Sequence, residues 1–235
     1  SVQVTKSTAT LPAIPEGGTG GNASDPFTFK VLPGAAFDAT VLFRIDIVSG
    51  SYEDFDFVSI SINPSFRDMT SGQLMMTVTA NGMFGFTDYP TNSLGGGMKY
   101  GAVNALLYHA SAMIGTDEAH IVDNARSTGD FLSRRNDFRI VDAVTITSPA
   151  GGGNPAKLAT SRFTDAYADS ARRLNVDVLH RVYDYTNLGV PDVLISKFTV
   201  TNTGASALNG VRFGLFMDFG GYPQYYIASV AFDST

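Results

Sequence analysis

The sequence predicts an all-β protein built from two β-sandwich-like units in tandem, residues 1–64 and residues 65–235. Short segments in which apolar and polar residues alternate recur along the chain, and this is the period of half-buried strands. Gly, Pro, Asn or Asp bound these segments, as turns between strands require. Apolar residues make up 44% of the 235 residues and charged residues only 16%, so a packed core is expected.

Strands are expected wherever such a segment is rich in β-branched or aromatic residues. In order they are FTFKV (27–31), DATVLFRIDIV (38–48), DFDFVSISIN (54–63), QLMMTVTANGMFGF (73–86), FRIVDAVTIT (138–147), VDVLHRVYDYT (176–186), DVLISKFTVTN (192–202), VRFGLFMDF (211–219) and YYIASVAF (225–232). Asn81-Gly82 predicts a tight hairpin whose two turn residues both have positive φ. Pro64 ends a strand, and residues 65–73 are expected to be a connector that separates the two units.

In three further segments the alternation of apolar and polar residues does not by itself indicate the structure. Residues 102–115 are rich in helix formers, but their apolar residues form no clean helical stripe and glycines bracket them, so a strand is preferred. Residues 164–175 are either a short helical turn or a polar hairpin tip. Residues 148–157, SPAGGGNPAK, are a loop.

The stretch KFTVTNTGASALNGVRFGLFMDF, residues 197–219, is interpreted as scaffold. Phe198, Val200, Val211, Phe213 and Leu215 alternate with polar residues and glycine on both sides of a polar turn. The stretch holds no nucleophile with a base and no cluster of metal ligands.

Charge excludes two classes of partner. The formal net charge is −6, which argues against nucleic acid and against an anionic membrane surface. No apolar run approaches the roughly 18 residues of a membrane span, so membrane insertion is not expected. The chain has no cysteine, which excludes disulfides and thiolate metal sites.

Catalytic motifs are absent from the sequence. His109, His120 and His180 lie in apolar or mixed segments and are interpreted as structural, because no GxSxG elbow or HExxH motif accompanies them. The glycine-rich residues 17–22 and 95–101 lack the strand-to-helix context of a phosphate loop. No catalytic residue and no cofactor is therefore expected.

Acidic residues gather in two places, and their role as metal ligands stays open. They are Glu53, Asp54 and Asp56 in SYEDFDF, and Asp117, Glu118 and Asp123 in TDEAHIVDN. Calcium needs six to eight oxygen ligands and no EF-hand loop is present, so a solvated strand face is the preferred interpretation of Asp54 and Asp56. The enzyme alternative uses Asp117 and Asp123 as paired carboxylates.

Surface ligands have two further candidate positions. The aromatic stretch at residues 220–229, GGYPQYYIAS, could bind sugar, although core packing is the usual role of such residues in β-proteins. Asn22 begins a formal glycosylation sequon.

Two regions resemble known protein families. Residues 25–64 resemble the Ig-like, CARDB-type β-sandwich modules of large secreted bacterial proteases, through PFTFKV, a Pro-Gly turn, VLFRIDI and DFDFVSISINP. TVTANGMFGFTDYP, GGGMKYG, NALLYHASAMIGTDEAHIVDNAR and DVLISKFTVTNTGASALNGVRFGLFMDF are similar to the segment that follows such a module in subtilisin-like (S8 family) peptidases. The chain departs from that pattern at YHASA and MDFGG, which removes the basis for a ligand role of Asp218.

The resemblance implies a non-catalytic extracellular or cell-surface protein of bacteria. Only the later strands of the Ig-like module are expected within residues 1–64, so an edge is expected to pair with another copy or with a neighbouring domain. Residues 1–22 are the expected donor strand and tether of a filament built by strand addition. The alternative is an accessory module of a secreted subtilisin-like protease that binds carbohydrate or calcium.

Overall fold

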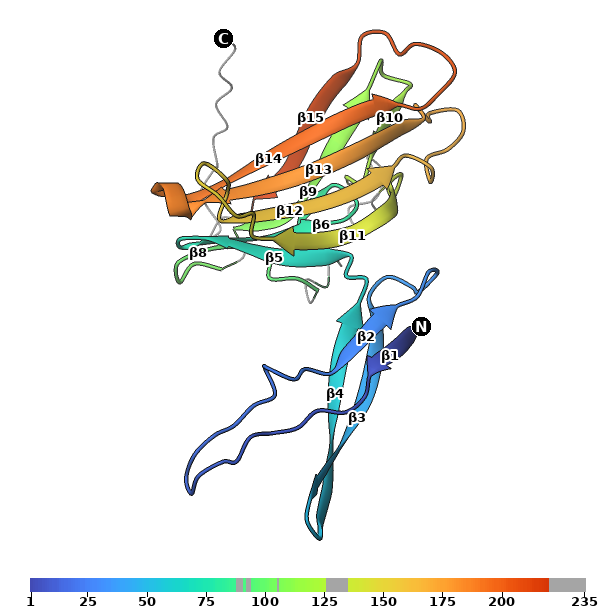
Figure 1. The fold of residues 1–235 in the computed structure, drawn as a ribbon. Helices are drawn as coiled ribbons and strands as arrows, with labels where there is room; N and C mark the ends of the chain where they lie inside the picture. Colours follow the sequence, from blue (N-terminus) through green and yellow to red (C-terminus); the bar gives the residue numbers. More distant parts are fainter. Residues whose placement is uncertain (88–90, 92–93, 105, 126–134, 220–235) are drawn as a thin grey trace. The chain divides into compact units, whose positions relative to one another are not determined.

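The computed structural model describes residues 1–87, 91, 94–104, 106–125 and 135–219 (Figure 1). The predicted all-β class is confirmed: every sheet is antiparallel, and the one helical element of the described part is a 3-10 turn, η1, at Thr186–Leu188. The chain divides into two compact units, Ser1–Pro64 (unit 1) and Ser65–Thr235 (unit 2). Each unit has its own sheets, and the two are described separately.

Unit 1 consists of two separate two-stranded sheets. Its strands are β1 (Val2–Lys6), β2 (Thr28–Val31), β3 (Ala39–Ser49) and β4 (Tyr52–Ile62). β1 pairs with β2, and β3 pairs with β4 without a break from Ala39↔Ile62 to Ser49↔Tyr52. Ile62 is the only buried residue of the unit, with 4% of its surface exposed. Unit 1 therefore has strands but no hydrophobic core of its own.

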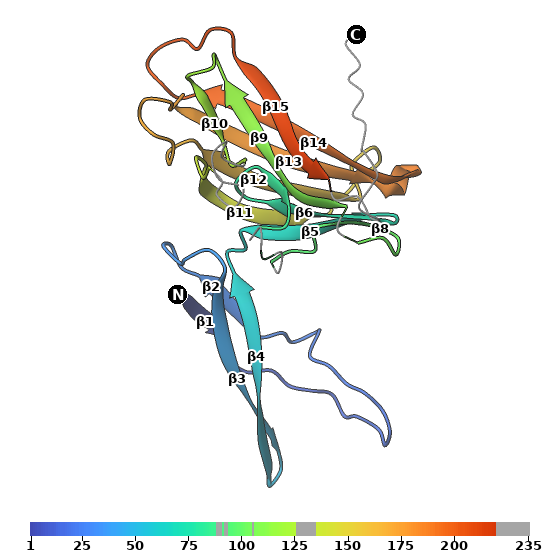
Figure 2. The same ribbon diagram turned by 180° about the vertical axis from the view of Figure 1, so that it is seen from behind.

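Unit 2 contains a seven-stranded and a four-stranded sheet. The larger sheet holds β5 (Phe66–Ser71), β6 (Leu74–Thr79), β7 (Met83–Gly85), β8 (Met98–Tyr100), β9 (Leu107–Gly115), β10 (Ile121–Asp123) and β15 (Arg212–Phe219). The smaller sheet is a meander of β11 (Arg139–Thr147), β12 (Lys157–Thr164), β13 (Val176–Tyr185) and β14 (Val190–Asn202). In the larger sheet β9 pairs with β15 on one side and with β7 and β10 on the other (Figure 2).

The hydrophobic core of unit 2 lies between its two sheets. One cluster joins Met69 and Phe84 of the larger sheet to Val144 and Val182 of the smaller sheet, and all four are almost fully buried. A second cluster contains Phe163, whose ring lies 4.8 Å from that of Phe138. Burial of this kind contributes on the order of 25 cal/mol per Å² of apolar surface, so the packing of the two sheets stabilises unit 2.

Gly82 shows how closely the connection between β6 and β7 approaches the facing sheet. Its φ is +74°, and a Cβ atom there would lie 2.6 Å from Cζ of Phe163. Both facts require glycine at this position.

Several expectations are confirmed in detail. Of the segment 102–115, for which a strand was preferred, residues 107–115 form one, and residues 148–156 connect β11 to β12. Residues 165–175 connect β12 to β13, so the hairpin interpretation of this segment is correct.

Two expectations are wrong. Residues 65–73 are not only a connector, because Phe66–Ser71 form β5 and pair with β6. Met69 and Ser71 are buried there. The strand was not predicted because Arg67, Asp68 and Thr70 interrupt its apolar residues and one of its two buried residues is a serine. The Asn81-Gly82 hairpin exists, but only Gly82 has a positive φ, so the expected pair of positive φ angles is absent.

The scaffold stretch at residues 197–219 crosses between sheets. Phe198 lies on β14 of the smaller sheet and Phe213 on β15 of the larger sheet, with ring centroids 4.8 Å apart. The turn-rich residues 203–211 thus connect two facing sheets instead of two paired strands.

Candidate functional site

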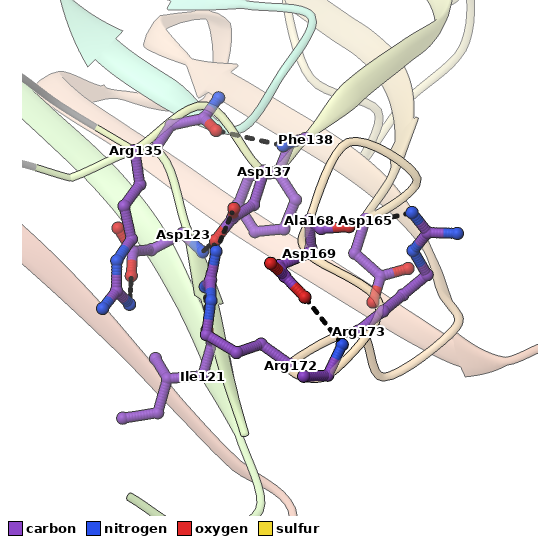
Figure 3. Close-up of polar contacts among 12 residues, drawn as sticks. Ile121, Asp123, Arg135, Asp137, Phe138, Asp165, Ala168, Asp169, Arg172 and Arg173 are labelled. Atoms are coloured by element: carbon purple, nitrogen blue, oxygen red, sulfur yellow. Dashed lines mark hydrogen bonds and ion pairs between the residues drawn. The ribbon is translucent and has the colours of Figure 1, made fainter. Parts of the chain in front are cut away.

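Two buried aspartates and two partly exposed arginines form a cluster in unit 2 (Figure 3). Asp123, the last residue of β10, is 2% exposed, and Asp137 is 3% exposed. Arg172 donates to both carboxylate oxygens of Asp137 at 2.9 Å. Arg135 donates to Oδ2 of Asp123 at 3.1 Å.

Backbone groups complete the bonding of this cluster. The N–H of Asp123 donates to Asp137 at 3.0 Å, and the N–H of Ala125 donates to Asp123 at 2.8 Å. Arg172 also donates to the carbonyl oxygen of Ile121. The pairs therefore tie β10, the segment before β11 and the β12–β13 connection to one another.

The electrostatics of the cluster match a structural role. Burial raises the pKa of Asp123, against the lowering effects of the Ala125 N–H and Arg135. The hydrogen bonds to Asp137 raise the pKa of the Arg172 guanidinium. Each buried carboxylate has a guanidinium of its own, which is how proteins hold charge away from water.

The structure does not bring together the predicted carboxylate pair, Asp117 and Asp123. Asp117 lies in an exposed turn and accepts hydrogen bonds from the backbone N–H groups of Ala119 and His120. Its carboxylate also lies 2.8 Å from Nδ1 of His120, and this contact lowers its pKa. Asp123 instead belongs to the cluster with Asp137. The sequence did not predict this cluster, because residues that are distant along the chain are brought together only by the fold.

A second buried carboxylate organises the β12–β13 connection. Asp165 is 2% exposed and accepts hydrogen bonds from the backbone N–H groups of Leu174, Asn175 and Val176 at 2.6 to 3.0 Å. These three donors would otherwise be unsatisfied in a buried turn. Asp165 is therefore a structural residue of the loop.

The three histidines occupy two kinds of environment. His109 on β9 and His180 on β13 are almost fully buried, and His120 is exposed in a turn rather than in the expected strand-like segment. The His180 ring stacks on Phe198, with centroids 4.2 Å apart and planes 2° apart. Burial lowers the pKa of His180 to about 3, so this side chain is neutral and packs as an aromatic residue.

The other expected ligand positions are engaged in local contacts. Asp54 and Asp56 are exposed on β4, and each accepts a hydrogen bond from the next backbone N–H. In the glycine-rich residues 95–101, the N–H of Gly96 donates to Asp68 and Thr77 inside the chain. Within the described residues no group of three or more acidic or histidine side chains could hold a metal ion. The aromatic stretch at residues 220–229 lies outside the described residues.

β15 is a strand of the larger sheet with several exposed apolar side chains. Phe213, Leu215, Met217 and Phe219 share the face that is turned toward the smaller sheet, yet each is 37% to 44% exposed. In the described part of the chain β15 pairs only with β9. Among the residues that the structure describes, no strand pairs with the backbone N–H and C=O groups of its second edge.

A hollow lies on the other face of the larger sheet, next to the same strand. It has a volume of about 290 Å³, and Met113, Gly115, Ile121, Arg212 and Gly214 are among its lining residues. The register places these five on one face, because Gly115 pairs with both Arg212 and Ile121, and Met113 pairs with Gly214. Nothing lies within 4 Å of the position that a Cβ atom of Gly214 would take.

Unit 1 presents a second apolar surface on β3 and β4. On one face Ile45 and Ile47 lie opposite Asp56 and Asp54. On the other face Phe55 and Phe57 are about half exposed, and the Arg44 guanidinium lies 4.5 Å from the Phe55 ring centroid. Both faces of the β3–β4 hairpin therefore carry uncovered apolar side chains.

Comparisons with known proteins do not assign a family: no family model, no curated protein and no solved structure matches the chain. No helix among the described residues is long and apolar enough to cross a membrane.

Proposed function

We propose that the chain is a non-catalytic structural or adhesive module of a bacterial protein that acts outside the cell or at its surface. Unit 2, with its two facing sheets, is of the β-sandwich kind, and unit 1 becomes sandwich-like when strand addition with another copy or a neighbouring domain completes its sheet. One observation carries the proposal: unit 1 holds four strands but buries only Ile62.

The β3–β4 hairpin supports strand addition on physical grounds. A two-stranded hairpin is marginally stable in water, and three or more strands with a covered apolar face are needed for independent stability. Here eleven residue pairs form the ladder, and within unit 1 the outer edges of β3 and β4 pair with no other strand. A further strand would satisfy those edges and cover Leu42, Phe55 and Phe57, which are all more than half exposed.

β1 is the proposed donor. It is five residues long and pairs with β2 in its own chain, with Val2 opposite Val31. Residues 7–27, which contain no strand, connect the two. A connection of this length lets β1 pair with β2 of its own chain or with a sheet edge of another copy, as in domain swapping. Head-to-tail exchange of this kind gives an open filament when the rotation does not close.

Contacts at the base of this connection set the balance between the two pairings. Lys6 forms an ion pair with Asp25, and the N–H of Thr10 donates to the same carboxylate. The ion pair lowers the pKa of Asp25. Both groups are partly exposed, so the closed form is held by solvent-screened contacts.

The test is the assembly state of the full chain and of a variant that lacks residues 1–22. Light scattering after gel filtration is expected to show polymers of the full chain that grow with concentration, and no such growth for the deletion variant. Ala13→Pro, in the exposed connection, is the matched control and should assemble as the full chain does, because residue 13 lies in no strand. A full chain whose mass does not grow with concentration contradicts the proposal.

Calorimetry separates this role from the accessory-module alternative. The proposed structural role predicts no heat when calcium or a panel of glycans is titrated into the full chain. A saturable heat would instead favour a binding module.

A further inference from the structure

The edge of β15 that pairs with no strand in the described part of the chain has a sequence that is complementary to itself. In an antiparallel pair of two β15 strands centred on Leu215, Leu215 faces its own copy. Phe213 then faces Met217, and Arg212 faces Asp218 of the other chain. We infer that β15 is the interface of a symmetric dimer, in which the larger sheets of two copies join edge to edge.

The apolar face of β15 supports this pairing. Phe213, Leu215 and Met217 are 39% to 44% exposed although they point toward the smaller sheet of their own unit. In the centred register each of them lies directly opposite an apolar residue of the second copy. Cross-strand apolar pairs are a main source of sheet stability, so this register covers surface that the single chain leaves in water.

The charged residues specify the register. Arg212 and Asp218 lie at opposite ends of β15 and share the face away from the smaller sheet. A shift by two residues would place Arg212 opposite Phe216 or would leave it beyond the end of the strand. A carboxylate accepts several hydrogen bonds, so Arg212 of the second copy adds to the contacts that Asp218 makes within its own chain. Two Arg–Asp pairs then flank the apolar centre.

The hollow beside Gly214 is a third and independent observation. In the centred register Gly214 lies opposite Phe216 of the second copy. Gly214 has nothing within 4 Å of its Cβ position, and the hollow of about 290 Å³ lies on that face. An aromatic side chain opposite an edge glycine covers the exposed backbone, which is a known device of stable sheets.

β14, the edge strand of the smaller sheet, differs from β15 in the feature that prevents pairing. It carries Lys197 at the middle of its exposed face, and a lysine on an edge strand opposes association. β15 has no charged residue between Arg212 and Asp218. The contrast favours β15 over β14 as a pairing edge.

Engineered cysteines test both the surface and the register, because the chain has no cysteine of its own. Facing residues of an antiparallel pair have Cα atoms about 4.5 or 5.5 Å apart, which lies within the range of about 4.4 to 6.8 Å for disulfides. On mild oxidation of the full chain, Leu215→Cys is expected to give a covalent dimer on a non-reducing gel. Phe213→Cys alone should give little, and the double variant Phe213→Cys/Met217→Cys should restore the dimer. A Phe213→Cys variant that cross-links as well as Leu215→Cys overturns the register.

A charge placed at the symmetry axis tests the interface without a cross-linking reaction. In the variant that lacks residues 1–22, and with them the proposed donor strand, Leu215→Lys puts two lysines opposite each other and is expected to turn a dimer into a monomer in sedimentation equilibrium, with unchanged far-UV circular dichroism. Ile195→Lys, at a similarly exposed position on β14, is the matched control and should remain dimeric. A Leu215→Lys variant that dimerises as well as the control overturns the proposal. The interface involves unit 2 alone, so these outcomes are independent of strand exchange by β1.

Discussion

The β3–β4 hairpin of unit 1 and the β12–β13 hairpin of unit 2 have the same local design but very different surroundings. Both alternate apolar and polar side chains, and both form antiparallel ladders without a register shift. On β13 every second residue from Val176 to Asp184 is buried, whereas on β4 only Ile62 is. Alternation thus specifies a strand and its two faces, and a second sheet decides whether one face becomes a core.

The same contrast predicts where substitutions act. In unit 2, shortening an apolar side chain removes contacts between the two sheets and should lower the free energy of unfolding. In unit 1 of the isolated chain, the same kind of substitution removes few contacts and should change that free energy little. Four measurements sharpen or break this comparison.

The largest effect is expected from shortening a core aromatic residue. Phe163→Ala removes a ring that is fully buried against Phe138 and Gly82, and it should lower the free energy of unfolding by about 3 to 5 kcal/mol. Phe57→Ala, on the half-exposed face of β4, should change it by less than about 0.5 kcal/mol. Urea unfolding followed by circular dichroism checks both. Equal losses would show that unit 1 also has a covered face.

Acid should destabilise unit 2 through His180. Burial lowers the pKa of this residue from 6.5 to about 3 in the folded chain, so the unfolded chain binds a proton that the folded chain does not. The stability that neutral His180 contributes is fully present above the pKa of this residue in the unfolded chain. It is lost as the pH falls toward the pKa of this residue in the folded chain. From pH 7.5 to 4.5 the loss should be about 2.5 kcal/mol.

The His180→Phe variant isolates this term from the titration of carboxylates. Phenylalanine keeps the stacking on Phe198 and does not titrate. Urea unfolding at pH 7.5, 5.5 and 4.5 should give a pH dependence that is flatter for the variant than for the unmodified chain. Parallel profiles would show that His180 takes up its proton while folded.

A smaller effect is expected at the β12–β13 connection. Asp165→Ala leaves three backbone N–H groups without their acceptor in a buried turn, and it should cost about 2 kcal/mol. Asp169→Ala, four residues away and exposed, is the control and should cost less than about 0.5 kcal/mol. Thermal unfolding of the three proteins measures the difference. If Asp169→Ala lowered the stability as much as Asp165→Ala does, the loss would not be specific to the hydrogen bonds that Asp165 accepts.

The smallest effect is expected in unit 1. Arg44→Ala removes the guanidinium that lies 4.5 Å from the Phe55 ring centroid, an exposed cation–π contact worth about 0.5 kcal/mol. Amide hydrogen exchange of β3 and β4 should quicken about twofold, while β12 and β13 remain unchanged. Faster exchange in both hairpins would indicate that the two units open together.

The sequence was informative where alternation was long and apolar, as for β3, β4, β13, β14 and the strand form of residues 107–115. It failed for β12, KLATSRFT, and for short strands with few apolar residues. β8 and β10 have three residues each, and β5 holds polar residues between its buried ones. Such strands exist because a neighbouring strand supplies hydrogen bonds, and no local signal reports that neighbour.

The charged residues show the same limit. Asp123 and Arg172 were visible as single residues, but their pairing with Arg135 and Asp137 arises only when β10 and the β12–β13 connection meet. The expected Asp117–Asp123 pair relied on closeness in sequence. In the fold Asp117 belongs to an exposed turn, and Asp123 is the buried end of a strand.

The path of residues 203–211 from one sheet to the other has a consequence for the order in which unit 2 folds. The meander from β11 to β14 pairs each strand with the next one in sequence, so its ladders close over short loops. β9 gains the partner on its other side only when β15 arrives about a hundred residues later, and pairings of this span form slowly. On the ribosome the four-stranded sheet is expected to be complete while the larger sheet still lacks one edge. In pulsed hydrogen exchange during refolding, the amides of β12 and β13 should therefore become protected before those of β9. The pairing of β15 with β9 is then a late step in the folding of unit 2.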